Sequence, residues 1–421
     1  MKKFLKLLSR HKTIVENTSY LSILEILILT IPLLSYPYLT RTVGMEKYGW
    51  ILTSMMFVSY FSLIINFGTQ EVCAKHISVN RDNLDKLSEI FSSVIVARFL
   101  LWVLSFCLYI LILSCIPSYR EYRTLFLLSY GLTLNELLFP SFYFQGVEKM
   151  KYITIISAAL RLMSLVLIFL VVRKVGDYIL VPICYSVGYL LAGIVSFYII
   201  LVKEGVRLYI PNFRTILFYI KDSFYIFSTD VISTIKDKFN YLLVGRFLGP
   251  ESVVIYDLGS RLINIINKPI SIIVRVLFPV FAKNRNITML KTIKKYVYLL
   301  SFFSVLIVEI FLPYIVEFFL GSNVDIWPIR IYLLASLVLP VSIFIASNYF
   351  IALGYNQYIF KGILVTTILY VIVLVVLWLS GLLSNIYAFV TCAVISFYVE
   401  YLYRVIKVKE VEKNEIKMIY K

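Results

Sequence analysis

The segment 251–282 places charged and amide side chains at helical spacing within an apolar stretch. Asp257, Arg261, Asn264, Lys268 and Arg275 follow one another at intervals of 4, 3, 4 and 7 residues, so a helix brings them to one face. A guanidinium group binds phosphate oxygens through two parallel hydrogen bonds, and an ammonium group binds them as a point charge. The stripe could therefore hold a phosphate-bearing ligand.

Ion pairing is a second role for the same side chains. Asp257 and Arg261 can pair at i and i+4. Lys268 and Arg275 have no acidic partner on their own helix, which makes them the first candidates for binding a pyrophosphate. A salt bridge to the helix expected at 216–246 accounts for these two cations equally well.

Two further arginines lie inside apolar runs in the first half of the chain. Arg98 and Arg161 fall at depths where an ionisable side chain is costly and usually marks a ligand pathway or an ion pair. We expect each arginine either to bind substrate or to neutralise Glu25 or Glu136. The sequence leaves both interpretations open.

The ionisable side chains expected inside the membrane are balanced, with 7 basic and 7 acidic groups. A cavity of mixed charge suits a phosphate-bearing substrate together with a coupling ion, H⁺ or Na⁺. The acidic residues that could exchange this ion are Glu25, Asp230 and Glu309. Nothing in the sequence chooses among the three.

Two matching segments predict structural helix ends. Arg41 and Arg246 each precede a glycine, Gly44 and Gly249. A cation in the last turn favours the helix dipole, and glycine lets the chain leave the helix. Contact with a lipid head group is the alternative role for both arginines.

The composition places these residues in a membrane protein. Of the 421 residues, 60% are hydrophobic, and the mean hydropathy is +0.87. A membrane-crossing helix needs roughly 20 apolar residues, and twelve such runs are found. They fall near 17–40, 48–70, 88–115, 122–146, 151–172, 178–202, 216–246, 251–282, 292–319, 327–353, 358–380 and 383–406. We predict an all-α integral membrane protein with twelve transmembrane helices.

The basic residues predict the orientation of these helices. With the amino terminus in the cytoplasm, 26 of the 41 Lys and Arg residues fall in cytoplasmic segments and 8 on the opposite side. This asymmetry follows the positive-inside rule and places both termini in the cytoplasm. It also accounts for the net charge of +17, so no nucleic-acid partner is expected. The first run lacks a signal-peptide cleavage site and is expected to be a retained helix.

An internal repeat divides the chain into two lobes. PYLTRTVGMEKYGWI from Pro37 aligns with YLLVGRFLGPESVVIYD from Tyr241 at an offset of 205 residues, and Gly146 aligns with Gly354 at 208. We expect an N-terminal lobe of six helices, 1–205, and a C-terminal lobe of six, 206–421. Because six is even, both lobes cross the membrane in the same direction.

The remaining chemistry-bearing residues predict no catalytic or metal site. The five cysteines lie mostly in apolar runs without metal or redox spacing, and the two histidines, His11 and His76, lie in polar segments. The sequence contains no hydrolase triad and no phosphate-binding glycine-rich loop. We therefore expect a protein that is not an enzyme and uses neither a cofactor nor a metal.

The chain resembles polysaccharide flippases of the Wzx type. The resemblance rests on NTSYLSILEILILTIPLLSYPYLTRTVGMEKYGWI, FSLIINFGTQEVCAKHIS and NYLLVGRFLGPESVVIYDLGSRL, and it covers the whole chain. These flippases belong to the multidrug/oligosaccharidyl-lipid/polysaccharide (MOP) exporter superfamily, which also contains multidrug and toxin extrusion (MATE) transporters and the lipid II flippase. The resemblance implies a MATE-like fold of two six-helix lobes.

The resemblance also implies a function. It implies that an undecaprenyl-pyrophosphate-linked oligosaccharide crosses from the cytoplasmic to the outer leaflet of the cell inner membrane by alternating access, for O-antigen, capsule or exopolysaccharide assembly. The implied partners are this lipid-linked oligosaccharide, membrane lipids, and a glycan polymerase with other assembly proteins. Two alternatives remain: a multidrug or cation exporter of the same superfamily, and an integral-membrane glycan polymerase or glycosyltransferase.

Overall fold

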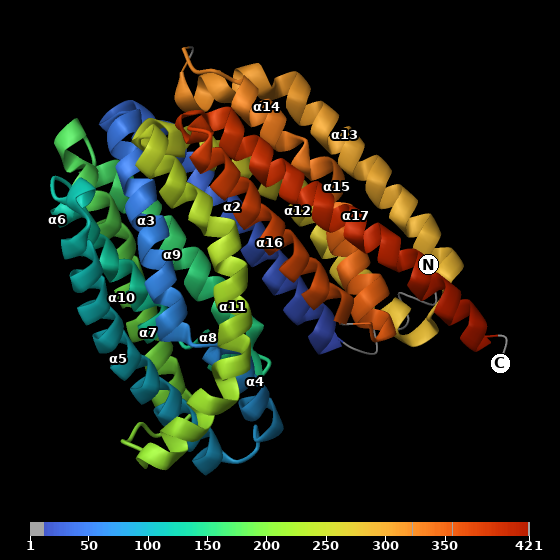
Figure 1. The fold of residues 1–421 in the computed structure, drawn as a ribbon. Coiled ribbons are helices and arrows are strands. Elements are labelled where there is room, and N and C mark those ends of the chain that lie inside the picture. The colour runs from blue at the N-terminus through green and yellow to red at the C-terminus, as the bar shows by residue number, and fades with distance from the viewer. Residues whose placement is uncertain (1–11, 322, 356, 420–421) are drawn as a thin grey trace. The chain divides into compact units, whose positions relative to one another are not determined.

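The computed structural model describes residues 12–321, 323–355 and 357–419, and every regular element within them is a helix (Figure 1). Helices satisfy their own backbone hydrogen bonds, as an apolar environment requires. Ten helical segments among the described residues are long and apolar enough to cross a membrane. They are Ile23–Val43, Met45–Val79, Leu84–Cys115, Arg123–Gly146, Met150–Val171, Val175–Lys203, Ile287–Leu320, Trp327–Ile351, Gln357–Leu379 and Ile386–Glu415. They coincide with ten of the twelve predicted spans.

The other two predicted spans correspond to the long helices α11 (Phe213–Leu248) and α12 (Pro250–Asn284). These helices contain 36 and 35 residues, so at a rise of 1.5 Å per residue each is about 50 Å long. Either helix could cross a hydrocarbon core of about 30 Å. Neither is among these ten segments, and several side chains of both helices lie outside the described residues.

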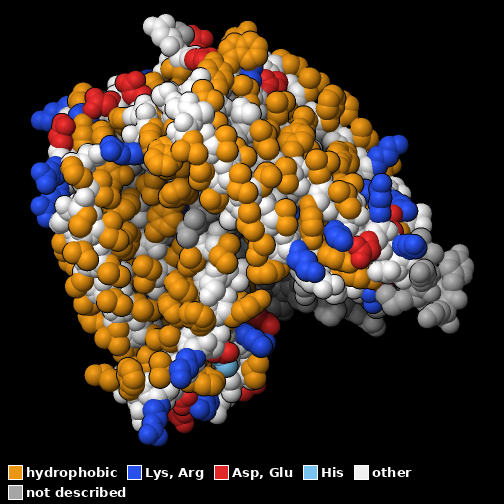
Figure 2. Space-filling model, in the orientation of Figure 1, with side chains coloured by type: hydrophobic (Ala, Val, Ile, Leu, Met, Phe, Trp, Pro, Cys, Tyr) orange, Lys and Arg blue, Asp and Glu red, His pale blue; other side chains and the backbone are white. Residues whose placement is uncertain are grey.

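The structure divides into two compact units, Met1–Leu242 and Leu243–Lys421, with the boundary inside α11. The first unit contains α2 (Lys12–Val43), α3 (Met45–Asn66), α4 (Thr69–Val79), α5 (Leu84–Cys115), α6 (Arg123–Ser129), α7 (Leu134–Leu138), α8 (Ser141–Gly146), α9 (Met150–Val171), α10 (Leu180–Tyr198) and most of α11. The second contains α12, α13 (Ile287–Leu320), α14 (Trp327–Leu333), α15 (Ala335–Phe344), α16 (Gln357–Leu379) and α17 (Ile386–Ile419). In both units large apolar side chains cover much of the helix sides, and charged side chains gather near helix ends (Figure 2).

In the first unit, α9 packs between α2 and α10 (Figure 1). Two hydrogen bonds fix the register of α2 on α9. The Thr154 hydroxyl donates to the Tyr20 carbonyl at 2.9 Å, and the Tyr38 hydroxyl donates to the Val172 carbonyl at 2.6 Å. Both contacts join residues 134 positions apart, so the two helices run parallel. This direction is the one expected for the first and fifth helices of a chain that crosses the membrane at each helix.

The second span is broken where α3 ends and α4 begins. Phe67 and Gly68 adopt left-handed backbone conformations with φ of 46° and 69°. A Cβ atom on Gly68 would lie 2.7 Å from the Ser223 carbonyl oxygen and 2.8 Å from the Phe227 nitrogen of α11. The Phe67 and Phe227 rings stack at 4.2 Å. The backbone of α11 therefore passes directly over the break.

The second unit is closed at one end by a contact between three segments. The guanidinium of Arg285, the left-handed residue that follows α12, donates to both carboxylate oxygens of Glu415 at 2.8 and 3.0 Å. It also donates to the Leu353 carbonyl at 2.8 Å. The Glu415 side chain is almost fully buried, so this bidentate pair joins the end of α12 to α17 and to the loop before α16.

The first unit has a related contact at the corresponding place in the sequence. Arg81 donates to Glu148 at 2.9 Å, again linking the segment before a long helix to the loop after α8. Asn83 and Asn286 cap the helices that follow, α5 and α13. Each asparagine side chain accepts a hydrogen bond from the backbone N–H three residues later, at 3.1 and 2.9 Å. The internal repeat thus extends to the helix caps.

The close approach at Gly68 predicts a specific cost of adding a methyl group. Gly68→Ala should lower the free energy of unfolding by about 2 kcal/mol more than Gly381→Ala. Both residues have nearly the same left-handed conformation, with φ of 69° and 72°, but nothing lies within 4 Å of a Cβ on Gly381. Thermal unfolding of the purified full-length variants measures the difference. Equal losses would contradict the contact between α11 and Gly68.

Candidate functional site

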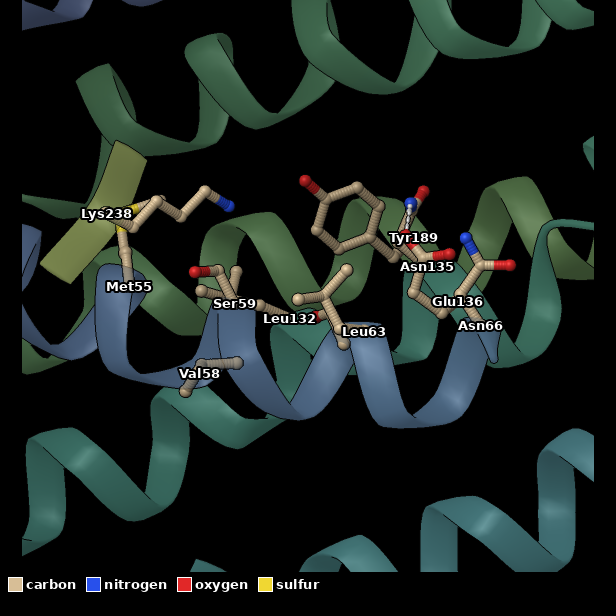
Figure 3. A pocket seen from close by; sticks show the side chains of 11 residues that line it. Met55, Val58, Ser59, Leu63, Asn66, Leu132, Asn135, Glu136, Tyr189 and Lys238 are labelled. Carbon is tan, nitrogen blue, oxygen red and sulfur yellow. Dashed lines mark hydrogen bonds between the residues drawn. The ribbon is translucent and has the colours of Figure 1, made fainter. Parts of the chain in front are cut away.

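A cavity of about 320 Å³ lies within the first unit (Figure 3). This volume is at the lower end of the range for ligand pockets. Its walls come from α3, from the interrupted fourth span, from α10 and from α11. The lining residues are Met55, Val58, Ser59, Ser62, Leu63, Asn66, Leu132, Asn135, Glu136, Tyr189 and Lys238.

The α3 wall carries a polar stripe. Ser59, Ser62 and Asn66 follow at spacings of three and four residues, so they share the face that lines the cavity. The sequence interpretation above did not include them. Their signal was present, because three polar side chains recur at helical spacing within an otherwise apolar run.

The fourth span is interrupted where it meets the cavity. A 3₁₀ turn at Tyr130–Thr133 leads into the short helix α7, which stops before Pro140, a residue without a backbone N–H. The break leaves Asn135 and Glu136 facing the cavity, and the Asn135 side-chain nitrogen donates to Glu136 Oε1 at 3.1 Å (Figure 3). Irregular backbone at membrane depth is tolerated where it is buried or lines a cavity.

Arg98 of α5 lies behind this wall and is completely buried. Its Nε donates to Thr69 Oγ1 at 2.9 Å, its Nη2 to Asn66 Oδ1 at 3.1 Å and its Nη1 to the Glu136 carbonyl at 2.7 Å. Its guanidinium also lies 5.1 Å from the centre of the Phe142 ring. Arg98 therefore donates to the backbone of Glu136, while its charge and that of the Glu136 carboxylate interact without a described hydrogen bond. Its geometry is that of a residue that positions two lining side chains.

The charges that line the cavity are one of each sign. Among the lining residues, Glu136 is the acidic side chain and Lys238 the basic one. Arg161 of α9 is half-buried, and its charge interacts with Tyr189 of the cavity wall. Its Nε is buried, and among the residues that the structure describes it has no hydrogen-bond partner.

The predicted stripe of α12 lies in the second unit. Asp257 is buried, and its carboxylate lies 2.6 Å from the Arg261 Nε, which is the expected ion pair. Asn264 is exposed, and Lys268 is half-buried and has an interaction of its own within the protein. Arg275 belongs to α12, but its side chain lies outside the described residues.

The three predicted coupling residues have different surroundings. Glu25 of α2 and Asp230 of α11 are both half-buried. Asp230 lies close enough to Glu71 for their charges to interact. Glu309 instead faces Arg330, with 3.6 Å between its carboxylate and the guanidinium.

The helix ends have the geometry expected of capping residues. Arg41 and Arg246 lie in the last turns of α2 and α11. Gly44 and Gly249 follow with φ of 83° and 86° and cap the next helices, with nothing within 4 Å of a Cβ at either position. These values of φ favour glycine.

A hydrogen-bonded group lies beside the first of these ends. The Tyr122 hydroxyl donates to Glu46 at 2.9 Å and accepts from Lys47 at 2.8 Å. Burial raises the pKa of Tyr122, so its hydroxyl remains a donor at neutral pH.

Comparison with known proteins gives a family and two curated relatives. A sequence model of the family described as "Polysaccharide biosynthesis protein" matches residues 14–285. A "Putative O-antigen transporter" of Escherichia coli (strain K12) is 28% identical over 269 residues, which are 63% of this chain and 64% of the relative. A protein of the same name from Shigella dysenteriae is 23% identical over 235 residues, 55% of this chain and 58% of the relative. The chain thus aligns with less than two thirds of either relative.

Solved structures share the fold over nearly the whole chain. An inward-facing multidrug resistance MATE family transporter of the MOP superfamily has a TM-score of 0.71 at 13% identity. The alignment covers 92% of this chain and 99% of the transporter's chain. An outward-facing MATE family transporter has a TM-score of 0.64 at 14% identity, covering 95% of this chain and 96% of its own. At these identities the likeness concerns the fold alone.

The burial of Arg98 predicts a large loss of stability on truncation. Arg98→Ala should lower the free energy of unfolding by about 3 kcal/mol, because it removes three hydrogen bonds from a buried guanidinium. Arg98→Lys should recover only part of this loss, because an ammonium lacks the planar fork. Thermal unfolding of the purified protein measures both, with the exposed Arg120→Ala as the control. An Arg98→Ala variant as stable as the control would rule out the positioning role.

Proposed function

Because the chain belongs to the polysaccharide biosynthesis protein family, we propose that it is a flippase for lipid-linked oligosaccharides. It moves undecaprenyl-pyrophosphate-linked repeat units from the cytoplasmic to the outer leaflet for O-antigen, capsule or exopolysaccharide assembly. The observation that supports this proposal most directly is the polar cavity inside an otherwise apolar helical unit. The names of the two relatives and the MATE-like fold agree with it.

In this proposal the chain crosses the membrane twelve times, with both termini in the cytoplasm. The lengths of α11 and α12 and the parallel direction of α2 and α9 support this topology. The distribution of Lys and Arg supports it independently. The two lobes, 1–205 and 206–421, exchange between inward-open and outward-open arrangements, and α11 is the first helix of the second lobe.

Two separate sets of residues are proposed to contact the substrate. The glycan part enters the cavity of the first unit, with Arg161 beside it. The phosphate part is bound by Lys268 and Arg275 of α12, assisted by Arg261 and Asn264. Arg98 contributes indirectly, by positioning two of the cavity-lining residues.

A coupling ion, H⁺ or Na⁺, drives the cycle. Asp230 is a better candidate for exchanging it than Glu309, because Glu309 faces Arg330. Glu25 is the third candidate and has an interaction of its own within the protein. A half-buried carboxylate at membrane depth takes up a proton or a cation more readily when no guanidinium neutralises it.

The protein acts in the cell inner membrane as a multi-pass transporter, and a glycan polymerase receives the translocated units. Of the alternatives, export of cationic drugs is disfavoured by the family match, whose description concerns polysaccharide biosynthesis. A polymerase would need an extensive catalytic region outside the membrane. The described residues are almost entirely helical, with short connections between the spans.

Deletion of the gene should leave lipid-linked oligosaccharide in the inner leaflet and reduce surface polysaccharide at least about tenfold, because phosphate-linked glycans do not cross lipid unaided. Quantification of surface polysaccharide, with plasmid-borne wild type as the control, measures this effect. Native mass spectrometry of gently extracted protein should detect the bound lipid-linked glycan. Normal surface polysaccharide in a strain without a second flippase would contradict the proposal.

Replacing the coupling carboxylate should separate transport from the ion gradient. Asp230→Asn should reduce glycan translocation by about tenfold and remove its dependence on the H⁺ or Na⁺ gradient, while Glu309→Gln retains that dependence. Inverted vesicles with imposed gradients provide the measurement. If Asp230→Asn responds to the gradient as the wild type does, Asp230 is not the coupling residue.

A further inference from the structure

The polar groups that face the cavity include both hydrogen-bond donors and acceptors. Within the described part of the chain, the Tyr189 hydroxyl and the Asn66 side-chain nitrogen form no hydrogen bond. The Asn66 oxygen is already used, because it accepts from Arg98 and from the Gln70 backbone at 3.1 and 3.2 Å. Arg98 therefore fixes the Asn66 amide with its two N–H donors available.

The acceptors lie on the neighbouring wall. The Glu136 carboxylate accepts one hydrogen bond, from Asn135 at 3.1 Å on Oε1, which leaves Oε2 available. Asn135 uses its nitrogen in this contact, so its carbonyl oxygen is the second available acceptor. In Figure 3 the side chains of Asn66, Asn135, Glu136 and Tyr189 gather at one end of the cavity, and Ser59 and Lys238 lie toward the other.

This combination fits a hydroxyl-bearing ligand better than a phosphate. A sugar hydroxyl donates one hydrogen bond and accepts up to two, so it can use donors and acceptors together. A pyrophosphate only accepts, and it would meet the Glu136 carboxylate as a like charge. Arg98 is fully buried and uses all three of its nitrogens in contacts within the protein. Lys238 lies toward the other end of the cavity (Figure 3), and Arg161 interacts with the ring-bearing wall residue Tyr189.

The volume of the cavity and the Tyr189 ring indicate how much of a glycan the cavity can hold. At about 320 Å³ the cavity is at the lower end of the range for ligand pockets, so it suits one sugar residue of a larger glycan. The Tyr189 ring offers an apolar surface beside these polar groups, and its hydroxyl adds a donor.

We infer that the cavity of the first unit is a subsite for a single neutral sugar residue of the lipid-linked glycan, and that it does not hold the pyrophosphate. Glu136 and Asn135 accept hydrogen bonds from sugar hydroxyls, and Asn66 and Tyr189 donate to them. These four side chains determine which sugar is accepted. The inference rests on the proposed flippase function and adds the part of the substrate that this site recognises.

Binding to two lipids that differ only in the glycan tests this assignment. The probes are the lipid-linked oligosaccharide that accumulates in host cells lacking the protein, and undecaprenyl pyrophosphate without sugar. Tyr189→Phe and Glu136→Gln in the full-length purified protein should each weaken binding of the glycan-bearing lipid by about tenfold. Neither change should affect binding of the sugar-free lipid.

The controls make the same chemical changes elsewhere in the first unit. Tyr198→Phe alters an exposed tyrosine of α10, and Glu148→Gln alters the partner of Arg81 on a loop; both should bind the two lipids as the wild type does. Ser62→Ala is a smaller change in the cavity wall and serves if either main variant folds poorly. It should weaken binding of the glycan-bearing lipid and leave binding of the sugar-free lipid unchanged.

Three results would overturn the assignment. If the cavity variants weaken binding of both lipids equally, the pyrophosphate lies in the cavity. Unchanged binding of the glycan-bearing lipid in all three cavity variants would remove the cavity from the binding path. A wild-type protein that binds neither lipid would reject the flippase function itself, so this failure is distinct from the other two.

Discussion

The polar interior of the first unit depends on one buried guanidinium. Arg98 reaches from α5 to the break between α3 and α4, through Asn66 and Thr69, and to the interrupted fourth span, through the Glu136 carbonyl. A charge of this size is buried only when its hydrogen bonds are satisfied. The two helix breaks satisfy it, and in return the arginine holds the broken segments in place. The cavity lies between those segments because both meet the same side chain.

The breaks have local causes that differ from each other. At Gly68 the left-handed backbone lets α11 approach more closely than any Cβ would permit. At Pro140 the missing N–H prevents continuation of the short helix α7, which itself follows a 3₁₀ turn. In each case the interrupted backbone exposes polar groups that a continuous transmembrane helix would have satisfied internally. The polar groups of the cavity in this unit therefore gather where the helices are interrupted.

The sequence predicts features whose cause is local and misses those that require knowing which helices touch. Apolar runs predicted twelve spans, of which ten coincide with apolar helical segments of the structure, and i,i+4 spacing predicted the ion pair of Asp257 with Arg261. The role of Arg98 could not be predicted, because its partners lie 29 to 38 residues away on other helices. The long helices α11 and α12 lie where the other two spans are predicted. Ser59, Ser62 and Asn66 could have been found from spacing alone, but only the structure shows what their face lines.

The contacts of Arg81 and Arg285 have a consequence for how such a chain changes over evolutionary time. In each unit an arginine holds a loop in place. The partners described for Arg81 and Arg285 lie in the same unit as the arginine itself. The two contacts thus occupy equivalent positions of the internal repeat, one in each unit. Mutations can accumulate around the cavity of one copy while the fastening of the other is preserved. A duplicated transporter built in this way can acquire a preference for a new cargo without first losing its ability to fold.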